Sequence, residues 1–198
     1  MKTPALFIDI DGVLIRDIET QENVENIRLI RSAGPALSDI NSLSVPVITL
    51  LKLPTELYAA TVANKVQVLK ELKRKLARAS ARIDALYIFD EYHKNSQNGI
   101  LKKYKPNTDQ IVEACEKFNI DLTKSWMVTD NVFSIITAHT LEMHGTILVK
   151  TGKGVFHEKY LNQNNLTFDG MKVEVFSSFS ICRSTLKKSF SNLIEDYN

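Results

Sequence analysis

The stretch Leu-Phe-Ile-Asp-Ile-Asp-Gly-Val, residues 6–13, joins a short apolar run to two acids and a glycine. The run is too short for a helix and rich in β-branched and aromatic residues, so it predicts a buried strand over 6–10. Ligands of open α/β sheets bind outside the carboxyl ends of the strands, and two crowded carboxylates are costly unless a cation or a reaction uses them. An acidic loop without function is the simpler alternative. The position at a strand end favours a site built on Asp9 and Asp11.

Short apolar runs and helical stretches alternate along the rest of the chain. Further strands are predicted at 45–51, 85–89, 125–129 and 146–150, and helices at 55–82, 107–118 and 131–143. Strands separated by helices indicate βαβ units on a mostly parallel sheet. Residues 155–198 are less regular, with a strand predicted near 171–176 and a helix near 183–195. The pattern predicts one three-layer α/β domain over 1–198, with a motif-bearing core at 1–154 and an edge at 155–198.

Composition narrows the class of protein. The chain has 198 residues, 44% of them hydrophobic and 24% charged, which is ordinary for a globular protein. A net charge of +2 does not by itself indicate a nucleic-acid or membrane partner. Two cysteines cannot build a disulfide framework, and no apolar run approaches the roughly 20 residues of a spanning helix. A cytoplasmic protein is the expectation.

Three later residues stand at places where a ligand of such a sheet would be held. Thr49 ends the second predicted strand, Lys105 precedes Pro106 and a helix, and Asp130 follows the fourth strand. Taken singly, each has an ordinary explanation: a strand threonine, a surface lysine and a helix N-cap. The specific signal for a ligand site is the order Asp-x-Asp, Thr, Lys, Asp, with each residue at the expected end of a predicted strand or start of a helix.

This order of motifs resembles that of the haloacid dehalogenase superfamily of phosphatases, a Rossmann-like fold. The resemblance implies that Asp9 attacks phosphorus and that Asp11 protonates the leaving oxygen. It implies that Thr49 and Lys105 hold the phosphoryl oxygens. It also implies Mg²⁺ held by the side chains of Asp9 and Asp130 and the backbone carbonyl of Asp11.

A narrower resemblance covers residues 5–154 in outline. The segments Tyr104-Lys105-Pro106 and 120–130 are similar to the branch that contains D-glycero-D-manno-heptose 1,7-bisphosphate phosphatases and histidinol-phosphatases. That branch has only a minimal cap, so the resemblance implies a compact domain.

The chain departs from that branch at several points. The loop 90–104 contains His93 but none of the cysteines of the branch's zinc loop, so no structural zinc is expected. After Thr49 the chain reads Leu50-Leu51-Lys52-Leu53 where the branch has a polar substrate loop, which argues against heptose specificity. Ser134 replaces a second acid that supports the metal, and weak Mg²⁺ binding is the consequence we expect.

Three functions stay open. The favoured one is a Mg²⁺-dependent phosphatase that acts on a small, sugar-like phosphorylated metabolite. Ser134 and the altered loop motivate a degenerate family member that binds a ligand or partner without useful turnover. A basic run over 65–82, with seven Lys or Arg against one Glu, motivates a phosphatase of nucleic-acid ends. Such a run is more often a solvated helix face, so nucleic acid is not the expected partner. The sequence does not indicate an oligomeric state.

Overall fold

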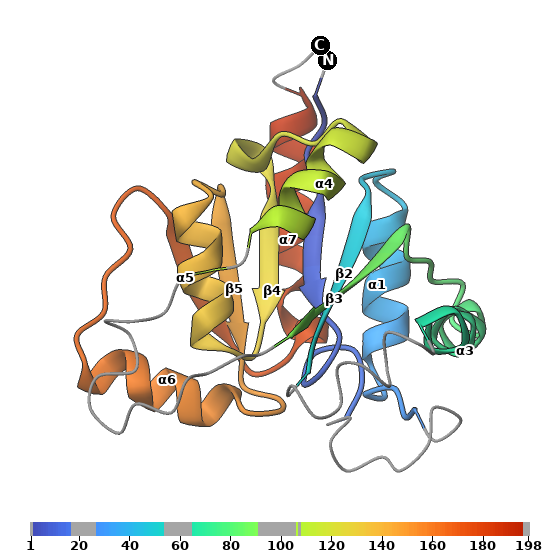
Figure 1. Ribbon diagram of the computed structural model, residues 1–198, viewed down its shortest axis with the longest axis horizontal. Helices are drawn as coiled ribbons and strands as arrows, with labels where there is room; N and C mark the ends of the chain where they lie inside the picture. The colour runs from blue at the N-terminus through green and yellow to red at the C-terminus, as the bar shows by residue number, and fades with distance from the viewer. Residues whose placement is uncertain (1, 17–26, 54–64, 91–105, 107, 196–198) are drawn as a thin grey trace.

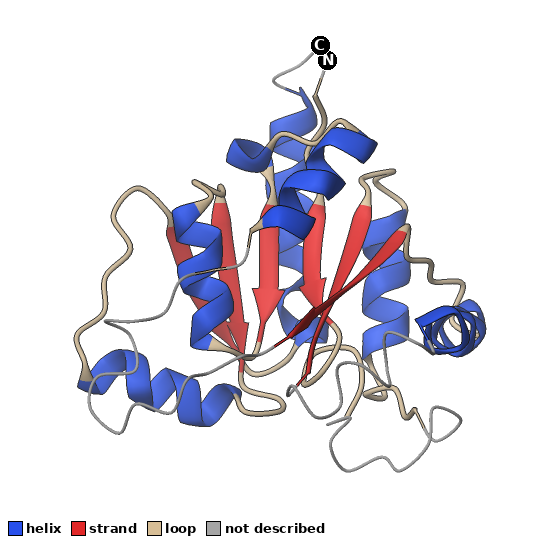
Figure 2. Ribbon diagram, in the orientation of Figure 1, coloured by secondary structure: helices blue, strands red, loops and turns tan. Residues whose placement is uncertain are grey.

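Six parallel strands form one central sheet in the computed structural model, which describes residues 2–16, 27–53, 65–90, 106 and 108–195. Their order across the sheet is β3-β2-β1-β4-β5-β6, and all of them point toward the same edge (Figure 2). The strands are β1 (Leu6–Asp9), β2 (Val47–Leu53), β3 (Ala85–Asp90), β4 (Trp126–Thr129), β5 (Gly145–Val149) and β6 (Lys172–Phe176). The predicted mostly parallel α/β sheet is confirmed.

Helices cover both faces of the sheet (Figure 1). Helices α1 (Ala33–Asn41), α3 (Lys65–Ala77) and α7 (Phe179–Glu195) share one buried core with the sheet. Helices α4 (Asp109–Phe118), α5 (Val132–Thr140) and α6 (Gly154–Gln163) share a second core on the opposite face. A 3₁₀ turn at Leu122–Lys124 leads into β4. The three layers expected from the sequence are therefore present.

The direction of the chain across the sheet reverses at β1. From β1 the chain adds β2 and β3 on one side, then crosses to β4 on the other side of β1. In an open α/β sheet, such a reversal separates the loops at the carboxyl ends of the strands and leaves room for a ligand. Asp9 and Asp130 stand at the ends of the two strands that flank this point.

The long predicted helix at 55–82 is shorter than expected at its carboxyl end. Helix α3 ends at Ala77. Ser80 has a φ of 54°, and the N–H of Ala81 donates to the carbonyl of Leu76. A left-handed residue with this hydrogen bond is the usual way to end a helix, and it is harder to foresee when the residue is serine instead of glycine. Residues 54–64 lie outside the described part of the chain.

Other boundaries differ from the prediction in ways that matter for the site. Strand β2 begins and ends two residues later than predicted, so Thr49 lies within it and does not end it. Helices α1 and α6 were not predicted, because Gly34-Pro35 and Gly152-Lys153-Gly154 look like turn signals in the sequence.

Some expectations fall on residues that the structure does not describe. Residues 91–105 include Lys105 and nearly all of the loop 90–104, in which no zinc ligands are expected. Over the described ranges, we find no helix with the length and apolar character needed to cross a membrane.

Candidate active site

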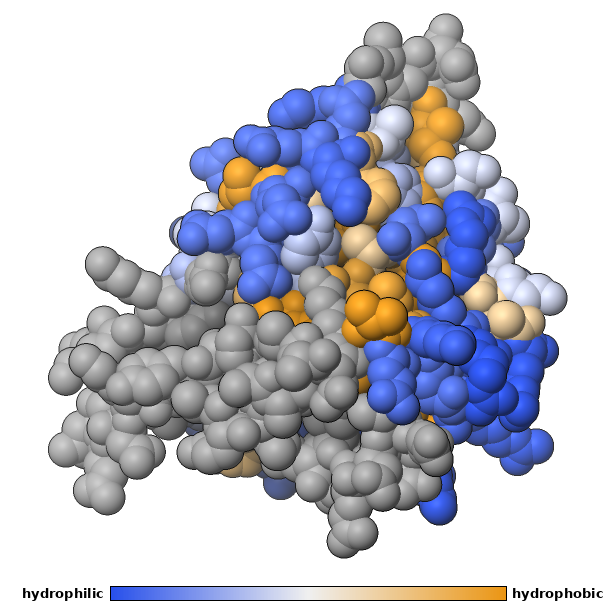
Figure 3. Space-filling model, turned by 45° about the vertical axis from the view of Figure 1, so that its right-hand side comes forward, coloured by the Kyte–Doolittle hydropathy of each residue, from blue (hydrophilic) through white to orange (hydrophobic). Residues whose placement is uncertain are grey.

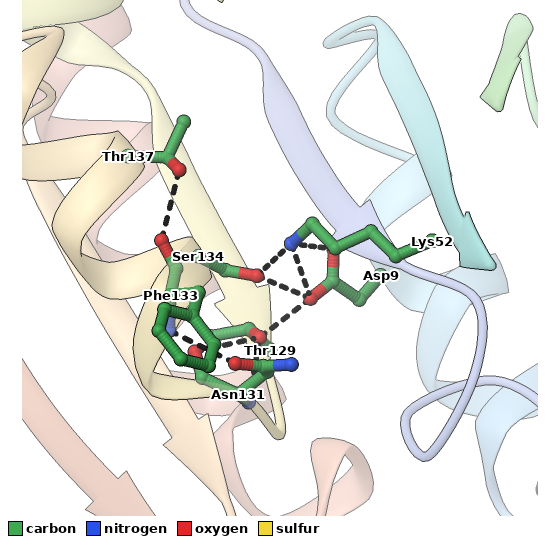
Figure 4. A network of polar contacts seen from close by, with 7 residues as sticks. All are labelled: Asp9, Lys52, Thr129, Asn131, Phe133, Ser134 and Thr137. Carbon is green, nitrogen blue, oxygen red and sulfur yellow. Dashed lines mark hydrogen bonds and ion pairs between the residues drawn. The ribbon is translucent and has the colours of Figure 1, made fainter. Parts of the chain in front are cut away.

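Asp9 is the centre of a buried polar network at the carboxyl end of β1 (Figure 4). Its carboxylate is 5% exposed. The hydroxyl of Thr129 donates to Oδ2 at 2.5 Å, and the hydroxyl of Ser134 donates to the same oxygen at 2.7 Å. Thr129 comes from the end of β4 and Ser134 from the first turn of α5. One carboxylate oxygen is thus held in place by two hydroxyls.

The second carboxylate oxygen of Asp9 is less constrained. Within the described residues its hydrogen-bonding contact is with Lys52, whose Nζ lies 3.4 Å from Oδ1 and 3.3 Å from Oδ2. The Lys52 ammonium also donates to Ser134 Oγ. Charged hydrogen bonds in tight pairs measure about 2.7–2.9 Å, so the ammonium is only loosely bound to this carboxylate.

The pairing of the strands explains why Lys52 meets Asp9. Asp9 pairs with Leu50, and side chains along a strand alternate between the two faces of the sheet. Lys52 is two residues beyond Leu50 and therefore shares its face. Because β2 continues to Leu53, this strand carries a lysine to the site, at the position where the resembled branch has a polar loop. The sequence had suggested that residues 50–53 remove polar groups from the site, and for Lys52 that interpretation is wrong.

Asp130 lies at the end of β4, enclosed by two glycine-containing loops. The N–H of Lys153 donates to its Oδ2 at 2.8 Å. A Cβ on Gly12 would lie 2.0 Å from Asp130 Oδ2, and a Cβ on Gly152 would lie 2.2 Å from the same atom. Both glycines also have positive φ. Only glycine fits at either position, because any side chain would collide with Asp130.

The carboxylate of Asp130 is electrostatically perturbed. Burial raises the pKa of Asp130 to about 7, and the nearby Asp9 carboxylate adds to this rise. The Lys153 N–H, and the charges of Lys52 and Lys153, act in the opposite direction. A buried carboxylate beside a second carboxylate, both at the carboxyl ends of neighbouring strands, is a place where a cation would be stabilised.

Asp11 lies in the tight turn that follows β1 and is half-buried. The N–H groups of Leu14 and Ile15 both donate to the carbonyl of Ile10, which folds the chain back on itself. The Thr151 hydroxyl donates to the carbonyl of Gly12 at 2.5 Å, so the loop after β5 is attached to this turn. The structure thus places Asp11 in the turn that adjoins Asp9 and Asp130.

The other predicted site residues are placed differently. Thr49 is fully buried, and its hydroxyl donates to the carbonyl of Ala85 at 2.6 Å. Thr49 pairs with Ile8 and so faces away from Asp9. The structure therefore does not bring Thr49 together with Asp9. Lys105 lies outside the described residues, so its expected phosphate contact stays a prediction. Ser134 is fully buried and binds Asp9 and Lys52 directly.

The donor set fits a hard divalent cation with few protein ligands. The resemblance implies that the carboxylates of Asp9 and Asp130 and the backbone carbonyl of Asp11 would hold the ion. Mg²⁺ is commonly held by one or two carboxylates and keeps several waters. In the part of the chain that the structure describes, no group of three or more His, Cys, Asp or Glu side chains could hold a metal ion. An ion bound by these oxygens would keep several of its waters.

Comparison with known proteins identifies the class. No family model matches the chain. It is 29% identical over 165 residues to the D-glycero-D-manno-heptose-1,7-bisphosphate 7-phosphatase of Thermosynechococcus vestitus, an alignment that covers 78% of this chain and 82% of that protein.

Solved structures give the same picture for the fold. The structure of a HAD-like phosphatase candidate from Mesorhizobium loti has a TM-score of 0.73 at 19% identity, covering 97% of this chain and 88% of that one. A D,D-heptose 1,7-bisphosphate phosphatase from B. bronchiseptica, complexed with magnesium and phosphate, has a TM-score of 0.69 at 18% identity, covering 95% and 99%. The fold is haloacid dehalogenase-like. Together, the sequence relative and these structures confirm the predicted resemblance to haloacid dehalogenase-like phosphatases and to the heptose bisphosphate phosphatase branch.

Proposed function

We propose that this protein is a Mg²⁺-dependent phosphatase that hydrolyses a small, sugar-like phosphomonoester through a phosphorylated Asp9. The observation that carries the proposal is the state of the Asp9 carboxylate. Thr129 and Ser134 hold its Oδ2, which leaves Oδ1 to face a ligand at the strand edge. A fixed, poorly solvated carboxylate is a suitable nucleophile for a phosphoryl group.

In the first step an Asp9 oxygen attacks phosphorus in line with the leaving oxygen. The Asp9 O–P bond forms as the bond between phosphorus and the leaving oxygen breaks. Asp11 donates its proton to that oxygen, so the product leaves as an alcohol. Mg²⁺, held by Asp9, Asp130 and the Asp11 carbonyl, would reduce the repulsion between the carboxylate and the anionic phosphate.

The second step returns the enzyme to its starting state. Asp11, now a carboxylate, takes a proton from a water molecule as the water oxygen attacks phosphorus. The Asp9 O–P bond breaks, inorganic phosphate leaves, and both aspartates regain their first protonation states. Lys105 is expected to hold phosphate charge, as the resemblance implies. We assign no phosphate contact to Thr49, because its hydroxyl already donates to Ala85 on the other face of β2.

The substrate class rests on the sequence relative. That protein is named for a heptose bisphosphate, which supports a phosphorylated sugar or a similar metabolite. A small phosphorylated metabolite is therefore the expected partner. A cytoplasmic location is expected, because such metabolites are found there.

Turnover of p-nitrophenyl phosphate tests the proposal. The wild-type protein should be active with Mg²⁺ and inactive with chelator. Asp9→Asn should abolish turnover because an amide cannot form the acyl-phosphate, and Asp11→Asn should impair it severely. Asp169→Asn, at an exposed position, is the matched control and should retain activity. An active Asp9→Asn protein would contradict the covalent mechanism.

A second candidate is a degenerate member that binds without turnover. The ion pair between Lys52 and Asp9 favours it, since a lysine on the nucleophile can also neutralise it. This candidate forecasts no turnover by the wild-type protein at any Mg²⁺ concentration. The nucleic-acid alternative rests on α3 and the turn after it, where Lys70, Lys73, Arg74 and Arg78 are exposed. Figure 3 shows a hydrophilic surface at the lower right of the molecule. A steep fall of oligonucleotide affinity with salt would support it.

A further inference from the structure

Lys52 is the one described lysine whose ammonium contacts the Asp9 carboxylate, and nothing in the motif order assigns it a role. Its side chain is 16% exposed, so Lys52 lies between the buried network and the solvent at the carboxyl ends of the strands. It reaches that place because β2 pairs with β3 through Leu53, which keeps residues 50–53 in a strand.

We propose that Lys52 positions the Asp9 carboxylate and binds the phosphoryl group during transfer, as a charged phosphate-binding residue supplied by β2. This inference rests on the proposed function above.

The directions of the hydrogen bonds support this role. Ser134 has a single hydroxyl hydrogen and donates it to Asp9, so toward Lys52 its oxygen acts as an acceptor. Lysine has three N–H donors and no acceptor. A carboxylate at position 134 would instead repel the Asp9 carboxylate and form an ion pair that neutralises the Lys52 ammonium. Serine at 134 thus leaves the lysine charge available to Asp9 and to an incoming anion.

The distances show that Asp9 does not hold the Lys52 ammonium tightly. Lys52 Nζ lies 3.3 and 3.4 Å from the two Asp9 oxygens, longer than a tight charged hydrogen bond. A phosphoryl oxygen that approaches beside Asp9 Oδ1 comes within reach of the same ammonium. As the Asp9 O–P bond forms, the carboxylate gives up its negative charge and the phosphoryl oxygens keep theirs, so the ammonium gains a partner when it loses one. Donors that stabilise charge developing in the transition state contribute roughly 100-fold or more to turnover.

The experiment compares Lys52→Met, Lys52→Arg and wild type, with Lys73→Met on the exposed face of α3 as control. Two quantities are measured: kcat and KM for p-nitrophenyl phosphate with Mg²⁺, and the affinity for inorganic phosphate by calorimetry. Circular dichroism establishes that each variant is folded. Lys52→Met should lower kcat/KM roughly 100-fold and weaken phosphate binding, Lys52→Arg should restore part of both, and Lys73→Met should change neither.

The outcomes separate this inference from the proposed function. A wild-type protein that binds phosphate but has no turnover contradicts the phosphatase. The role of Lys52 is then supported by loss of phosphate affinity in Lys52→Met and overturned by unchanged affinity.

In an active enzyme, Lys52→Met with kcat/KM and phosphate affinity within twofold of wild type overturns the inference. Loss of thermal stability alone, with phosphate affinity intact, also overturns it, because that is the behaviour of a purely structural ion pair. Should Lys52→Met fail to fold, Lys52→Gln decides the matter: kcat/KM and phosphate affinity within twofold of wild type without the positive charge would overturn the assignment. If the wild-type protein binds no phosphate, the inference is also overturned.

Discussion

At the scale of single residues, the site depends on two glycines whose backbone lies against the buried carboxylate of Asp130. Gly12 and Gly152 come from loops after different strands, and both pack against Asp130 Oδ2. The Lys153 N–H fixes the same oxygen. The sequence predicted Asp130 correctly as a residue at the end of the fourth strand, but Gly152-Lys153-Gly154 carried no assigned role. Its function is visible only once β4 and β5 are neighbours, because the loops at their ends are far apart in sequence.

Gly152→Ala should disturb the metal-binding carboxylate. The new Cβ would meet Asp130 Oδ2 and Gly12 Cα, neither of which can retreat freely. We expect the Mg²⁺ concentration for half-maximal activity to rise roughly 10-fold or more, as for other residues that orient a metal ligand. Activity titrated against Mg²⁺ is the measurement.

Gly170→Ala is the control for backbone strain. Gly170 also has a positive φ, 80°, but nothing lies within 4 Å of its added Cβ. This variant should lose a similar amount of stability, about 1 kcal/mol, without a change in Mg²⁺ dependence. An equal change in both variants would show that strain, and not contact with Asp130, is responsible.

At the scale of helices and strands, the carboxyl end of β2 distinguishes this chain from the branch that it resembles. Leu50 and Leu51 are buried in the two cores on opposite faces of the sheet, so they do not line a substrate loop. Thr49-Leu50-Leu51-Lys52-Leu53 was expected as the end of a strand and an altered loop. An apolar run cannot by itself show where a strand stops, and pairing with β3 is what extends it.

Heptose 1,7-bisphosphate should be a poor substrate, because residues 50–53 form a strand here and not a polar substrate loop. A hydroxyl-rich sugar needs hydrogen-bond partners, and pairing with β3 uses part of the backbone of 50–53. We expect kcat/KM below about 10⁴ M⁻¹s⁻¹, the floor of the usual range, in a steady-state assay of phosphate release. Smaller sugar phosphates in the same panel serve as the comparison. Efficient turnover of the bisphosphate would refute the argument from β2.

Helix α6 carries a buried histidine with an unsatisfied nitrogen. His157 Nδ1 has no hydrogen-bond partner among the residues described, and the rings of Phe133 and Phe156 lie against it. Burial, together with the charges of Lys153 and Lys52, lowers the pKa of His157 to about 4. Between pH 4 and about 6.5 the unfolded chain binds a proton that the folded chain does not, so the free energy of unfolding should fall as the pH falls.

Urea unfolding at pH 7 and pH 5 checks this expectation. The contribution of His157 should be about 1–3 kcal/mol, and His157→Gln should remove it. The raised pKa of Asp130 acts in the opposite sense, so the informative quantity is the difference between wild type and His157→Gln. The exposed His139→Gln is the matched control. If wild type and His157→Gln lost the same stability between the two pH values, the histidine would not be the cause.

At the scale of the whole molecule, the carboxyl-terminal region is built into the core. Strand β6 pairs with β5, and α7 buries Phe179, Leu186 and Phe190 against the sheet. The indole N–H of Trp126 in β4 donates to the Ser189 hydroxyl in α7 at 2.9 Å. We propose that residues 1–198 form a single domain. The sequence pattern predicted the five earlier strands well, because short apolar runs between helices are a strong signal. Over 155–198 it also predicted β6 and the greater part of α7, but it did not predict α6, whose hydrophobic periodicity is weak.

Phe190→Ala should destabilise the whole molecule and not α7 alone. Removing a fully buried phenylalanine costs about 3–5 kcal/mol, a large share of the usual 5–15 kcal/mol of total stability. Trp126 is the only tryptophan, so its fluorescence reports the docking of α7 on β4. Thermal unfolding followed by this fluorescence and by circular dichroism should give one coincident transition at a lowered Tm.

Ile181→Ala provides the control, because Ile181 lies on the same helix but is 58% exposed. Its Tm should stay close to that of wild type. Two separate transitions, with fluorescence lost before circular dichroism, would contradict a single domain.

The central claim is that Asp9 carries the phosphoryl group during turnover, and its most direct test is to locate that group. The protein is quenched in acid during turnover of p-nitrophenyl phosphate with Mg²⁺, digested, and the peptides are mapped by mass spectrometry. We predict a phosphoryl adduct on Asp9 that disappears in Asp9→Asn. An adduct on another residue, or an Asp9 peptide that stays unmodified while the protein turns over substrate, would contradict the account.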